Sequence, residues 1–312
     1  MPKPWTSDDI PDLSGKTIVV TGGNSGIGYE AALQFARKRA KVVLACRDLG
    51  KARSAAAQIA ASSPGADVEV MALDLSSLAS VRAFSDAFHS DHHALHVLCN
   101  NAGVMAIPYR LTTDGFEMQF GTNHLGHFAL TGLLLDLILA TGGARVVNVA
   151  SGAHRMGRMR FDDLQWKQGY RKWMAYGQSK LANLLFTFEL QRRADAAKKN
   201  FLCVACHPGY AATNLQAAGP KMQGSAMLES LFSVGNSLFS QSAAMGALPT
   251  EYAAVAPGVH GSDYIGPDGI AELWGHPKNV GCSAAAKDTA SAKRLWEVSE
   301  QLTGVRYNAL ES

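Results

Sequence analysis

Short apolar stretches alternate with longer stretches of mixed character through the first two-thirds of this 312-residue chain. The short stretches are apolar almost throughout and rich in β-branched residues, which is typical of strands buried on both faces of a parallel sheet. The predicted strands are Thr17–Val20, Lys41–Ala45, Val68–Ala72, His96–Cys99, Arg145–Val149 and Phe201–Cys206, with a last strand around Ser262–Ile265.

Helices are expected between these strands, near 26–39, 49–62, 77–90, 114–140 and 173–196, with a final helix from Lys287 to Leu302. Right-handed crossovers then give an α/β fold: a single-domain, Rossmann-type, doubly wound parallel sheet with helices on both faces. Ligands bind such a sheet in a crevice at the carboxyl ends of its strands. No linker divides the chain, so we expect an N-terminal extension at 1–14 and one domain at 15–312.

Composition narrows the class of protein. The hydrophobic fraction of 47% and the charged fraction of 18% fit a globular protein with a full core. The net charge is only +3, and no Lys/Arg cluster alternates with aromatic residues, so nucleic-acid binding is not expected. The longest apolar stretch, 128–140, is short and interrupted by Asp136, so no stable membrane anchor is expected. The N-terminus has no signal-peptide pattern, and we expect a cytoplasmic protein.

The five cysteines are an odd number, which favours reduced thiols in such a compartment. Cys203 and Cys206 have the spacing of a redox or metal pair. However, they lie on one predicted strand, where residues three apart point to opposite faces. We therefore expect both to pack in the core.

A glycine-rich turn follows the first strand and opens the first helix, in the run Thr21-Gly22-Gly23-Asn24-Ser25-Gly26-Ile27-Gly28. Glycines there allow a tight turn, close approach of the backbone to a phosphate, and close packing of helix on strand. The N-terminus of the following helix favours an anion, because its N–H groups are free and its dipole is positive there. The pattern predicts a dinucleotide site.

Tyr176 and Lys180 stand four residues apart on a predicted helix, so their side chains share one face. A nearby ammonium favours the phenolate and lowers the pKa of a tyrosine, which is ordinarily about 10. A phenol tuned in this way can exchange a proton near neutral pH. Together with the glycine turn, the pair indicates an enzyme.

The end of the second strand bears on the choice of cofactor. Folds that prefer NAD usually place an acidic residue there to bind the ribose 2′-hydroxyl, whereas this chain has Cys46 followed by Arg47. A neutral residue and a guanidinium suit a 2′-phosphate, so NADP(H) is the expected cofactor, with NAD(H) possible. The alternative is that Arg47 is an ordinary surface cation.

Further motifs follow later strands, and their order along the chain is specific. They are Thr21-Gly22-x-x-x-Gly26-x-Gly28, Asp74-Leu75, Asn100-Asn101-Ala102-Gly103, Asn123, Ser151, Tyr176-x-x-x-Lys180 and Pro208-Gly209 with Thr213. From residue 15 to about 215 the chain resembles the short-chain dehydrogenase/reductase family. Its runs 44–48, 122–128 and 176–183 resemble the retinol-dehydrogenase-like branch and its bacterial relatives, a branch that also resembles light-dependent protochlorophyllide reductase.

The resemblance implies a role for each matching residue. Tyr176 would be the general acid/base, Lys180 would lower its pKa and bind the nicotinamide ribose, and Ser151 would donate a hydrogen bond to the substrate oxygen. Asn123 would hold a water that links Lys180 to solvent. The cofactor would be bound by Gly22, Asn24, Ser25, Gly26, Ile27, Gly28, Arg47, Asp74, Leu75, Asn101, Ala102, Gly103, Tyr176, Lys180, Pro208, Gly209 and Thr213.

Ser151 lies farther from Tyr176 than in the shortest family members, so residues 154–173 must loop out. Ser179 is the fallback for Ser151, but its place on the helix would point it away. His124 and His127 flank Asn123 and are interpreted as packing residues. No set of histidines and carboxylates has the spacing of metal ligands, and no metal is expected.

The resulting hypothesis is an NADP(H)-dependent oxidoreductase that interconverts a carbonyl and an alcohol. The segments 152–172 and 214–250 would form the substrate side, and their apolar residues suggest a medium or large apolar substrate: a retinoid, steroid, aldehyde or ketone. The region 216–250 is either core-packing helix or a lid. Two alternatives stay open: a nucleotide-binding regulator or scaffold without turnover, and a C=C double-bond reductase. A homodimer or homotetramer is possible, because family relatives pair through the helices at 114–140 and 173–196, although others of the branch are monomers.

Overall fold

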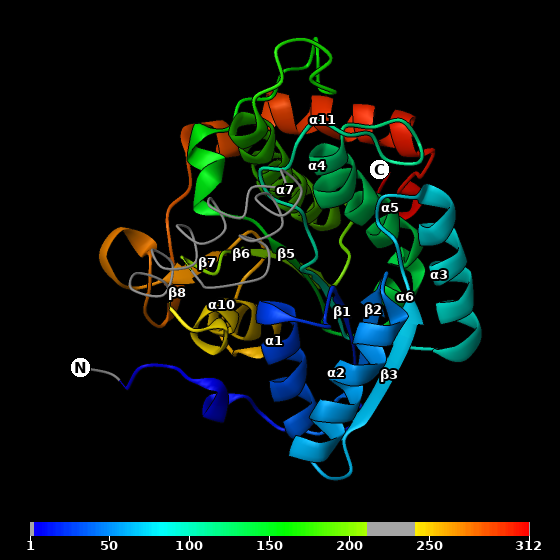
Figure 1. Cartoon of the computed structure of the whole chain (residues 1–312), viewed down its shortest axis with the longest axis vertical. Coiled ribbons are helices and arrows are strands. Elements are labelled where there is room, and N and C mark those ends of the chain that lie inside the picture. The colour runs from blue at the N-terminus through cyan, green and yellow to red at the C-terminus, as the bar shows by residue number, and fades with distance from the viewer. Residues whose placement is uncertain (1–2, 211–240, 312) are drawn as a thin grey trace.

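The computed structural model describes residues 3–210 and 241–311. At its centre lies an eight-stranded sheet in the order β3-β2-β1-β4-β5-β6-β7-β8 (Figure 1). All neighbours pair in parallel except β7 and β8, which are antiparallel. The strands are β1 Thr17–Thr21, β2 Lys41–Cys46, β3 Asp67–Ala72, β4 Val97–Asn100, β5 Ala144–Val149, β6 Phe201–Cys206, β7 Tyr264–Pro267 and β8 Pro277–Asn279.

Helices cover both faces of the sheet (Figure 1). One face carries α1 Gly26–Arg37, α2 Leu49–Ser62 and α10 Ala243–Val255. The other carries α3 Leu78–Asp91, α4 Met118–Phe120, the π-helical turn η2 Gly121–Leu125, α5 Gly126–Leu133, α6 Leu135–Ala140, α7 Lys172–Ala196 and α11 Thr289–Thr303. Short 3₁₀ turns complete the described residues: η1 Ser7–Asp9, η3 Gly152–Met156, η4 Ile270–Glu272, η5 Ala284–Lys287 and η6 Asn308–Leu310.

The central strands are buried on both faces, as their apolar sequences predict. Val42 and Leu44 of β2 pack into the core beneath α1 and α2, whereas Val43 packs into the core on the opposite face. Cys203 and Cys206 of β6 are likewise buried as free thiols in opposite cores. The α/β class, the parallel order of the first seven strands and the packing role of these cysteines are therefore confirmed.

The long helix expected at 114–140 is the element that differs most from expectation. It begins at Met118, passes through the π-helical turn at 121–125, and breaks again at Leu134, whose φ is −100° and ψ 7°. Apolar periodicity does not reveal a π turn, because one such turn merely shifts the buried face by part of a turn.

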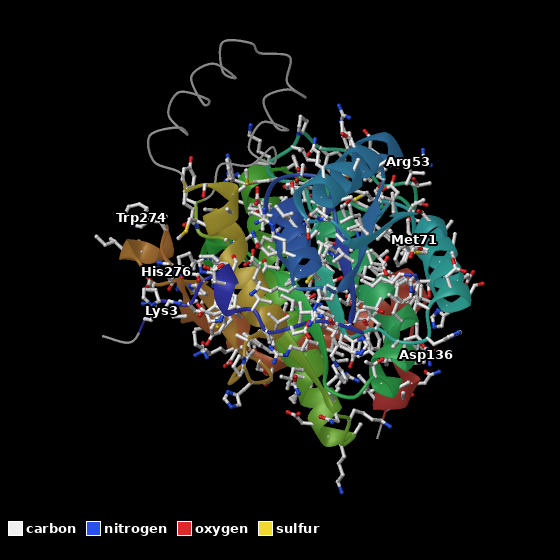
Figure 2. The ribbon with its side chains drawn as sticks, turned by 90° about the horizontal axis from the view of Figure 1, so that it is seen from below. Lys3, Arg53, Met71, Asp136, Trp274 and His276 are labelled. Carbon is white, nitrogen blue, oxygen red and sulfur yellow. The ribbon has the colours of Figure 1, made fainter. Side chains whose placement is uncertain are left out.

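Two further elements have no counterpart among the expected ones. β8 is three residues long and begins with a proline, so it carries almost no strand pattern. α10 contains Pro249, yet it is buried against the sheet, and the part of 216–250 that the structure describes is therefore core-packing helix. Figure 2 shows Trp274 and His276 at the β7–β8 end of the sheet and Met71 and Asp136 at the other end.

The N-terminal extension packs on α10. The Ser7 hydroxyl donates a hydrogen bond of 2.6 Å to Oε2 of Glu251, and the rings of Trp5 and Tyr252 meet edge to face. Ile10 and Leu13 are buried in the same core as α1. In residues 3–210 and 241–311, no helix is both long and apolar enough to cross a membrane.

Candidate active site

The glycine turn after β1 has the conformation that a dinucleotide site requires. Gly22 and Gly26 have φ of +66° and +55°, a region that side chains rarely adopt. A Cβ on Gly28 would lie 2.7 Å from the carbonyl oxygen of Gly22 and 2.4 Å from Nδ2 of Asn101, so only glycine fits there. Ser25 precedes α1 without capping it through its side chain, which leaves the helix N–H groups available to an anion.

The end of β2 lies against this turn. The N–H groups of Gly23, Asn24 and Gly22 face the sulfur of Cys46, although burial dominates and raises the pKa of the thiol to about 11. Arg47, the next residue, is exposed. Asp48 caps α2 by accepting a hydrogen bond from the N–H of Lys51. Cys46 is thus a neutral side chain at the position where an acidic residue would select NAD.

Thr21, the last residue of β1, connects the glycine turn to the loop after β4. Its Oγ1 accepts the N–H groups of Asn101 and Ala102, both at 2.9 Å, and lies 3.0 Å from Nε2 of His127. Nδ1 of His127 lies 3.1 Å from the carbonyl oxygen of Asn123, which can only accept, so Nδ1 carries the hydrogen and Nε2 is an acceptor. The one hydrogen of the Thr21 hydroxyl lies within reach of both Nε2 and the carbonyl oxygen of Cys99, which is 3.3 Å from Oγ1. Nδ2 of Asn101 also donates to the carbonyl of Thr21 at 2.8 Å.

Asn123 lies in the π-helical turn and holds the loop after β4. Its Oδ1 accepts the N–H of Val104 at 2.8 Å, and its Nδ2 donates to the carbonyl of Val104 and to Oγ of Ser179, each at 2.9 Å. Both amide hydrogens are therefore used by the protein, and the expected water could bind this amide only at Oδ1. Gly103 passes so close that a Cβ there would lie 3.0 Å from Oδ1 of Asn123.

Ser151, Tyr176 and Lys180 come together at the carboxyl end of β5. Ser151 follows β5, and its hydroxyl forms a hydrogen bond with the phenol of Tyr176 that lowers the phenol's pKa. Nζ of Lys180 lies 5.8 Å from the centre of the tyrosine ring and donates to the carbonyl of Val149 at 2.8 Å. Ser179 instead donates to the carbonyl of Tyr176, so it does not replace Ser151.

The pKa values differ from the expectation that Lys180 alone suggested. Burial raises the pKa of Tyr176 to about 12, and the hydrogen bond with Ser151 opposes this only in part. Burial also lowers the pKa of Lys180 to about 8, because the ammonium loses its water. The phenol is therefore a protonated acid at neutral pH in this structure.

The remaining predicted cofactor residues that the structure describes follow β3 or β6, or lie in α1. Gly209, after β6, has φ +65°, and a Cβ there would lie 2.4 Å from the carbonyl oxygen of Leu273. The carbonyl of Pro208 accepts a hydrogen bond of 2.6 Å from Gln241. Asp74 accepts from the backbone and hydroxyl of Ser76. Thr213 and most of the segment 214–250 lie outside the described residues. Leu75 is buried, and Ile27 packs against the core.

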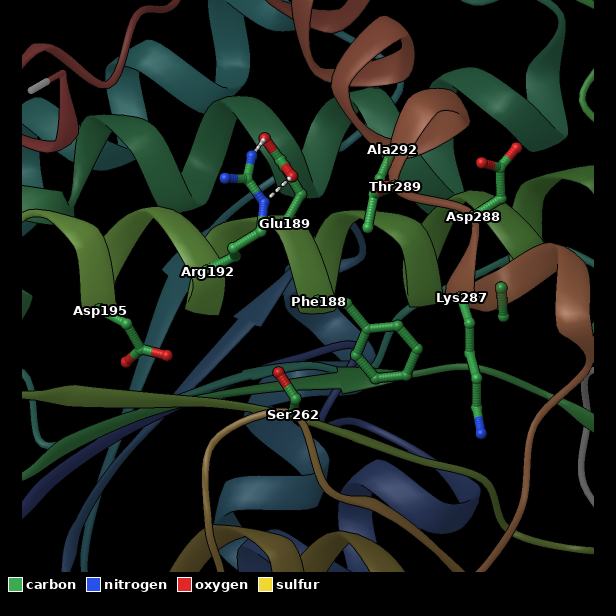
Figure 3. A pocket seen from close by; sticks show the side chains of 10 residues that line it. Phe188, Glu189, Arg192, Asp195, Ser262, Lys287, Asp288, Thr289 and Ala292 are labelled. Carbon is green, nitrogen blue, oxygen red and sulfur yellow. Dashed lines mark hydrogen bonds and ion pairs between the residues drawn. The ribbon is translucent and has the colours of Figure 1, made fainter.

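Sequence reasoning gave no role to Thr21 and treated His127 as packing. Their contacts join residues about 80 and about 106 positions apart, which no local spacing reveals. A hollow of about 300 Å³ lies elsewhere, between the second half of α7 and the start of α11 (Figure 3). Its buried carboxylate, Glu189, already forms ion pairs with Arg192 and Arg193, so its charge is neutralised within the protein.

Comparison with known proteins agrees with this geometry. The family model described as "short chain dehydrogenase" matches residues 16–224. Retinol dehydrogenase 12 of Mus musculus is 41% identical over 295 residues, which cover 95% of this chain and 88% of the relative. Retinol dehydrogenase 11 of Homo sapiens is 42% identical over 293 residues, covering 94% and 87%.

Among solved structures, an uncharacterised protein from Mycobacterium paratuberculosis is 43% identical. It has a TM-score of 0.81 and the match covers 98% of this chain and 99% of that one. The turn after β1, the crevice at the strand ends and these matches lead to one conclusion: the chain belongs to the short-chain dehydrogenase/reductase family and is an NAD(P)-dependent oxidoreductase of carbonyl and alcohol groups.

Proposed function

We propose that this enzyme uses NADP(H) to interconvert a carbonyl and an alcohol on a medium-to-large apolar substrate of the retinoid, steroid, aldehyde or ketone class. The observation that carries the proposal is the meeting of Ser151, Tyr176 and Lys180 at the carboxyl end of β5, beside the glycine turn. The residues fit the cofactor, because the positive φ of Gly22 and Gly26 and the close approach at Gly28 leave room for a phosphate at the start of α1.

The protein's own groups supply the proton. Tyr176, protonated at neutral pH, gives its hydrogen to the oxygen of a carbonyl, and Ser151 donates a hydrogen bond to the same oxygen as negative charge develops there. In the opposite direction the phenolate takes the proton from an alcohol. Lys180 holds a buried positive charge near the ring, which favours the phenolate that remains after transfer. The nicotinamide supplies or accepts the hydride when it is bound.

Cofactor preference rests on Cys46 and Arg47. The sulfur of Cys46 lies against the glycine turn and is uncharged, so it does not repel a 2′-phosphate as a carboxylate there would. Arg47 is exposed and can pair with that phosphate. The apolar substrate class is supported by the relatives, which are named retinol dehydrogenases. The cytoplasmic location is supported by five free cysteines, four of which are buried.

Replacement of Tyr176 by Phe tests the mechanism. Tyr176→Phe removes the proton donor but keeps the ring, so turnover of all-trans-retinal with NADPH should fall by ~100-fold or more, while NADPH still binds. Tyr307→Phe is the matched control, because its hydroxyl is equally buried but donates to the carbonyl of Phe128, away from the site. Turnover by Tyr176→Phe close to that of the wild type would contradict the mechanism.

The two alternatives give different results with the wild-type enzyme. A regulator or scaffold would bind NADPH and oxidise it with no member of a panel of aldehydes, ketones and enones. A C=C reductase would consume the enone double bond and leave its carbonyl intact, which product analysis detects. The complete set of Asn123, Ser151, Tyr176 and Lys180 favours the carbonyl reaction over the regulator.

A further inference from the structure

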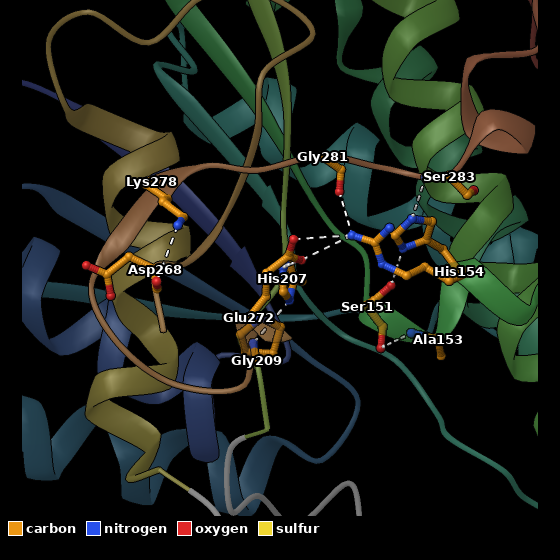
Figure 4. A network of polar contacts seen from close by, with 12 residues as sticks. Ser151, Ala153, His154, His207, Gly209, Asp268, Glu272, Lys278, Gly281 and Ser283 are labelled. Atoms are coloured by element: carbon orange, nitrogen blue, oxygen red, sulfur yellow. Dashed lines mark hydrogen bonds and ion pairs between the residues drawn. The ribbon is translucent and has the colours of Figure 1, made fainter. Parts of the chain in front are cut away.

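A series of polar contacts leads from the backbone of Ser151 to the residues around β8 (Figure 4). The carbonyl oxygen of Ser151 accepts the N–H of His154 at 3.0 Å and lies 2.7 Å from Nδ1 of the same residue. A carbonyl can only accept, so Nδ1 carries the hydrogen. Nε2 of His154 then accepts the N–H of Ser283 at 3.1 Å. The backbone of Ser151 is thereby tied to the segment that follows β8.

Arg155, the next residue, also binds the segment after β8 and extends this series of polar contacts. Its Nη2 donates to the carbonyl of Gly281 at 2.8 Å and lies 3.2 Å and 3.4 Å from the two carboxylate oxygens of Glu272. One nitrogen makes all three contacts. Glu272 belongs to the β7–β8 connection, so the contact joins the loop after β5 to that connection.

Glu272 also faces the loop after β6. Its Oε2 lies 3.2 Å from Nε2 of the buried His207, and Nδ1 of that ring accepts the N–H of Gly209 at 3.3 Å. The N–H of Tyr210 donates to the carbonyl of Leu273 at 2.7 Å, which is a second link between the same two loops. The contacts therefore lead from Ser151 to Gly209, a residue expected to bind the cofactor, although Nε2 of His207 makes no hydrogen bond within the described residues and meets Glu272 only by proximity.

The backbone that presents Glu272 is strained. Ala271 and Glu272 have φ of 53° and 58°, and neither is a glycine. Two successive left-handed residues with side chains cost free energy and persist only where surrounding contacts hold them. The carboxylate of Glu272, between a guanidinium and a buried imidazole, supplies such contacts.

We propose that Arg155 and Glu272 are positioning residues for the reaction. They hold the loop after β5, with Ser151, in a fixed position relative to the loop after β6, with Gly209. This inference rests on the proposed role of Ser151. When the Arg155–Glu272 pair is intact, the serine hydroxyl and the cofactor loop keep one relative position. When it is broken, the two loops move independently, and the substrate oxygen is no longer aligned with both its proton donor and the cofactor.

Four variants test the proposal. Arg155→Met and Glu272→Gln each remove the ion pair while keeping approximate volume. Arg155→Lys is the conservative variant, and because a single nitrogen of Arg155 contacts Glu272 and Gly281, an ammonium can replace it. Arg306→Met is the matched control, since Arg306 is an exposed arginine outside the expected substrate-side segments.

We expect Arg155→Met and Glu272→Gln to lower kcat for all-trans-retinal with NADPH roughly tenfold or more, as small misplacements do. The KM for retinal should change much less. Arg155→Lys should keep most of the activity, Arg306→Met all of it, and the double variant Arg155→Met/Glu272→Gln should be no worse than either single one.

Amide hydrogen exchange of the cofactor-free protein provides a readout that does not depend on turnover. The N–H groups of Ser283 and Gly209 should exchange faster in Arg155→Met and Glu272→Gln than in the wild type and in Arg306→Met. Additive losses in the double variant, unchanged exchange at both amides, or a loss of melting temperature with unchanged kcat would each overturn the proposal. If the wild type turned over no substrate, the proposed function would fail, while the exchange experiment would still decide whether the pair couples the two loops.

Discussion

Burial pushes both titratable groups of the catalytic pair towards their neutral forms. It raises the pKa of Tyr176 to about 12 and lowers that of Lys180 to about 8, and the hydrogen bond from Ser151 offsets the rise in the pKa of the phenol only in part. A protonated phenol suits the reduction of a carbonyl, in which the enzyme must give a proton. The serine therefore has two tasks, since it contacts the phenol and is expected to contact the substrate oxygen.

Two side chains at the end of β2 determine the predicted cofactor preference. The double variant Cys46→Asp/Arg47→Ala places a carboxylate against the N–H groups of the glycine turn and removes the cation, so it should bind a ribose hydroxyl and repel a 2′-phosphate. We expect kcat/KM to favour NADPH in the wild type and NADH in the variant, by ~10-fold or more in each case. Arg306→Ala, an exposed arginine near the C-terminus, is the control. Equal or better efficiency of the wild type with NADH would disprove the preference.

Local chemistry explains which residues of the site could be predicted from sequence. Tyr176 and Lys180 share a helix face, and the glycine turn is contiguous, so their spacing alone carries the information. Thr21 and His127 could not be found in this way, because their hydrogen bonds depend on strand order and on the π-helical turn. The pKa of Tyr176 was expected in the wrong direction, because a sequence shows the neighbouring lysine but not the depth of burial.

At the scale of elements, the π-helical turn of 121–125 aims Asn123 at the loop after β4. The same helix continues as α5, from which His127 reaches Thr21. The strands and most helices were predicted because each has a clear apolar period. The π turn, β8 and α10 were not, because each depends on contacts with distant parts of the sheet rather than on its own sequence.

The contact between the N-terminal extension and α10 contains a buried carboxyl group. Burial raises the pKa of Glu251 to about 8, against a hydrogen bond from Ser7 that lowers it. The folded protein thus holds a proton that the unfolded chain releases above about 4.5. The stabilisation is complete below that pH and is lost as the pH rises through 8, because the unfolded state binds fewer protons in this window.

Glu251→Gln should remove this pH dependence and keep an oxygen that accepts the Ser7 hydroxyl. We expect its melting temperature to exceed that of the wild type by a few degrees at pH 8, at about 2–4 °C per kcal/mol, and by less at pH 5. Glu297→Gln, at an exposed position of α11, should show no such difference. An equal shift at both pH values would mean that Glu251 does not hold a proton in the folded protein.

At the scale of the whole molecule, buried histidines should control stability in mild acid. Burial lowers the pKa of His124 to about 3 and those of His127 and His207 to about 4. Unfolded histidines titrate near 6.5, so below that pH the unfolded state binds more protons than the folded state. The free energy of unfolding therefore falls towards pH 4. Burial also lowers the pKa values of His96 and His154. Glu251, Glu117 and His89, whose pKa values are raised, act in the opposite direction but are fewer than these five histidines.

Urea unfolding between pH 7 and 5 measures this effect. We expect the free energy of unfolding to fall with decreasing pH, by roughly 1–3 kcal/mol per pH unit at its steepest. His124→Gln should reduce the slope by about one proton, because it removes one of the buried rings. The His124 ring contacts Phe186 of α7 and Ser299 of α11. A free energy that stays constant from pH 7 to 5 would show that these rings are protonated in the folded protein.

The position of α11 determines which face of α7 is open to a second copy of the protein. Trp296 of α11 packs against Phe186 of α7 with ring centres 6.0 Å apart, Arg193 of α7 lies over the indole, and Ser299 binds His124. The chain's own helix α11 therefore occupies this face of α7. A second copy could pair across this face only after α11 had been displaced from it.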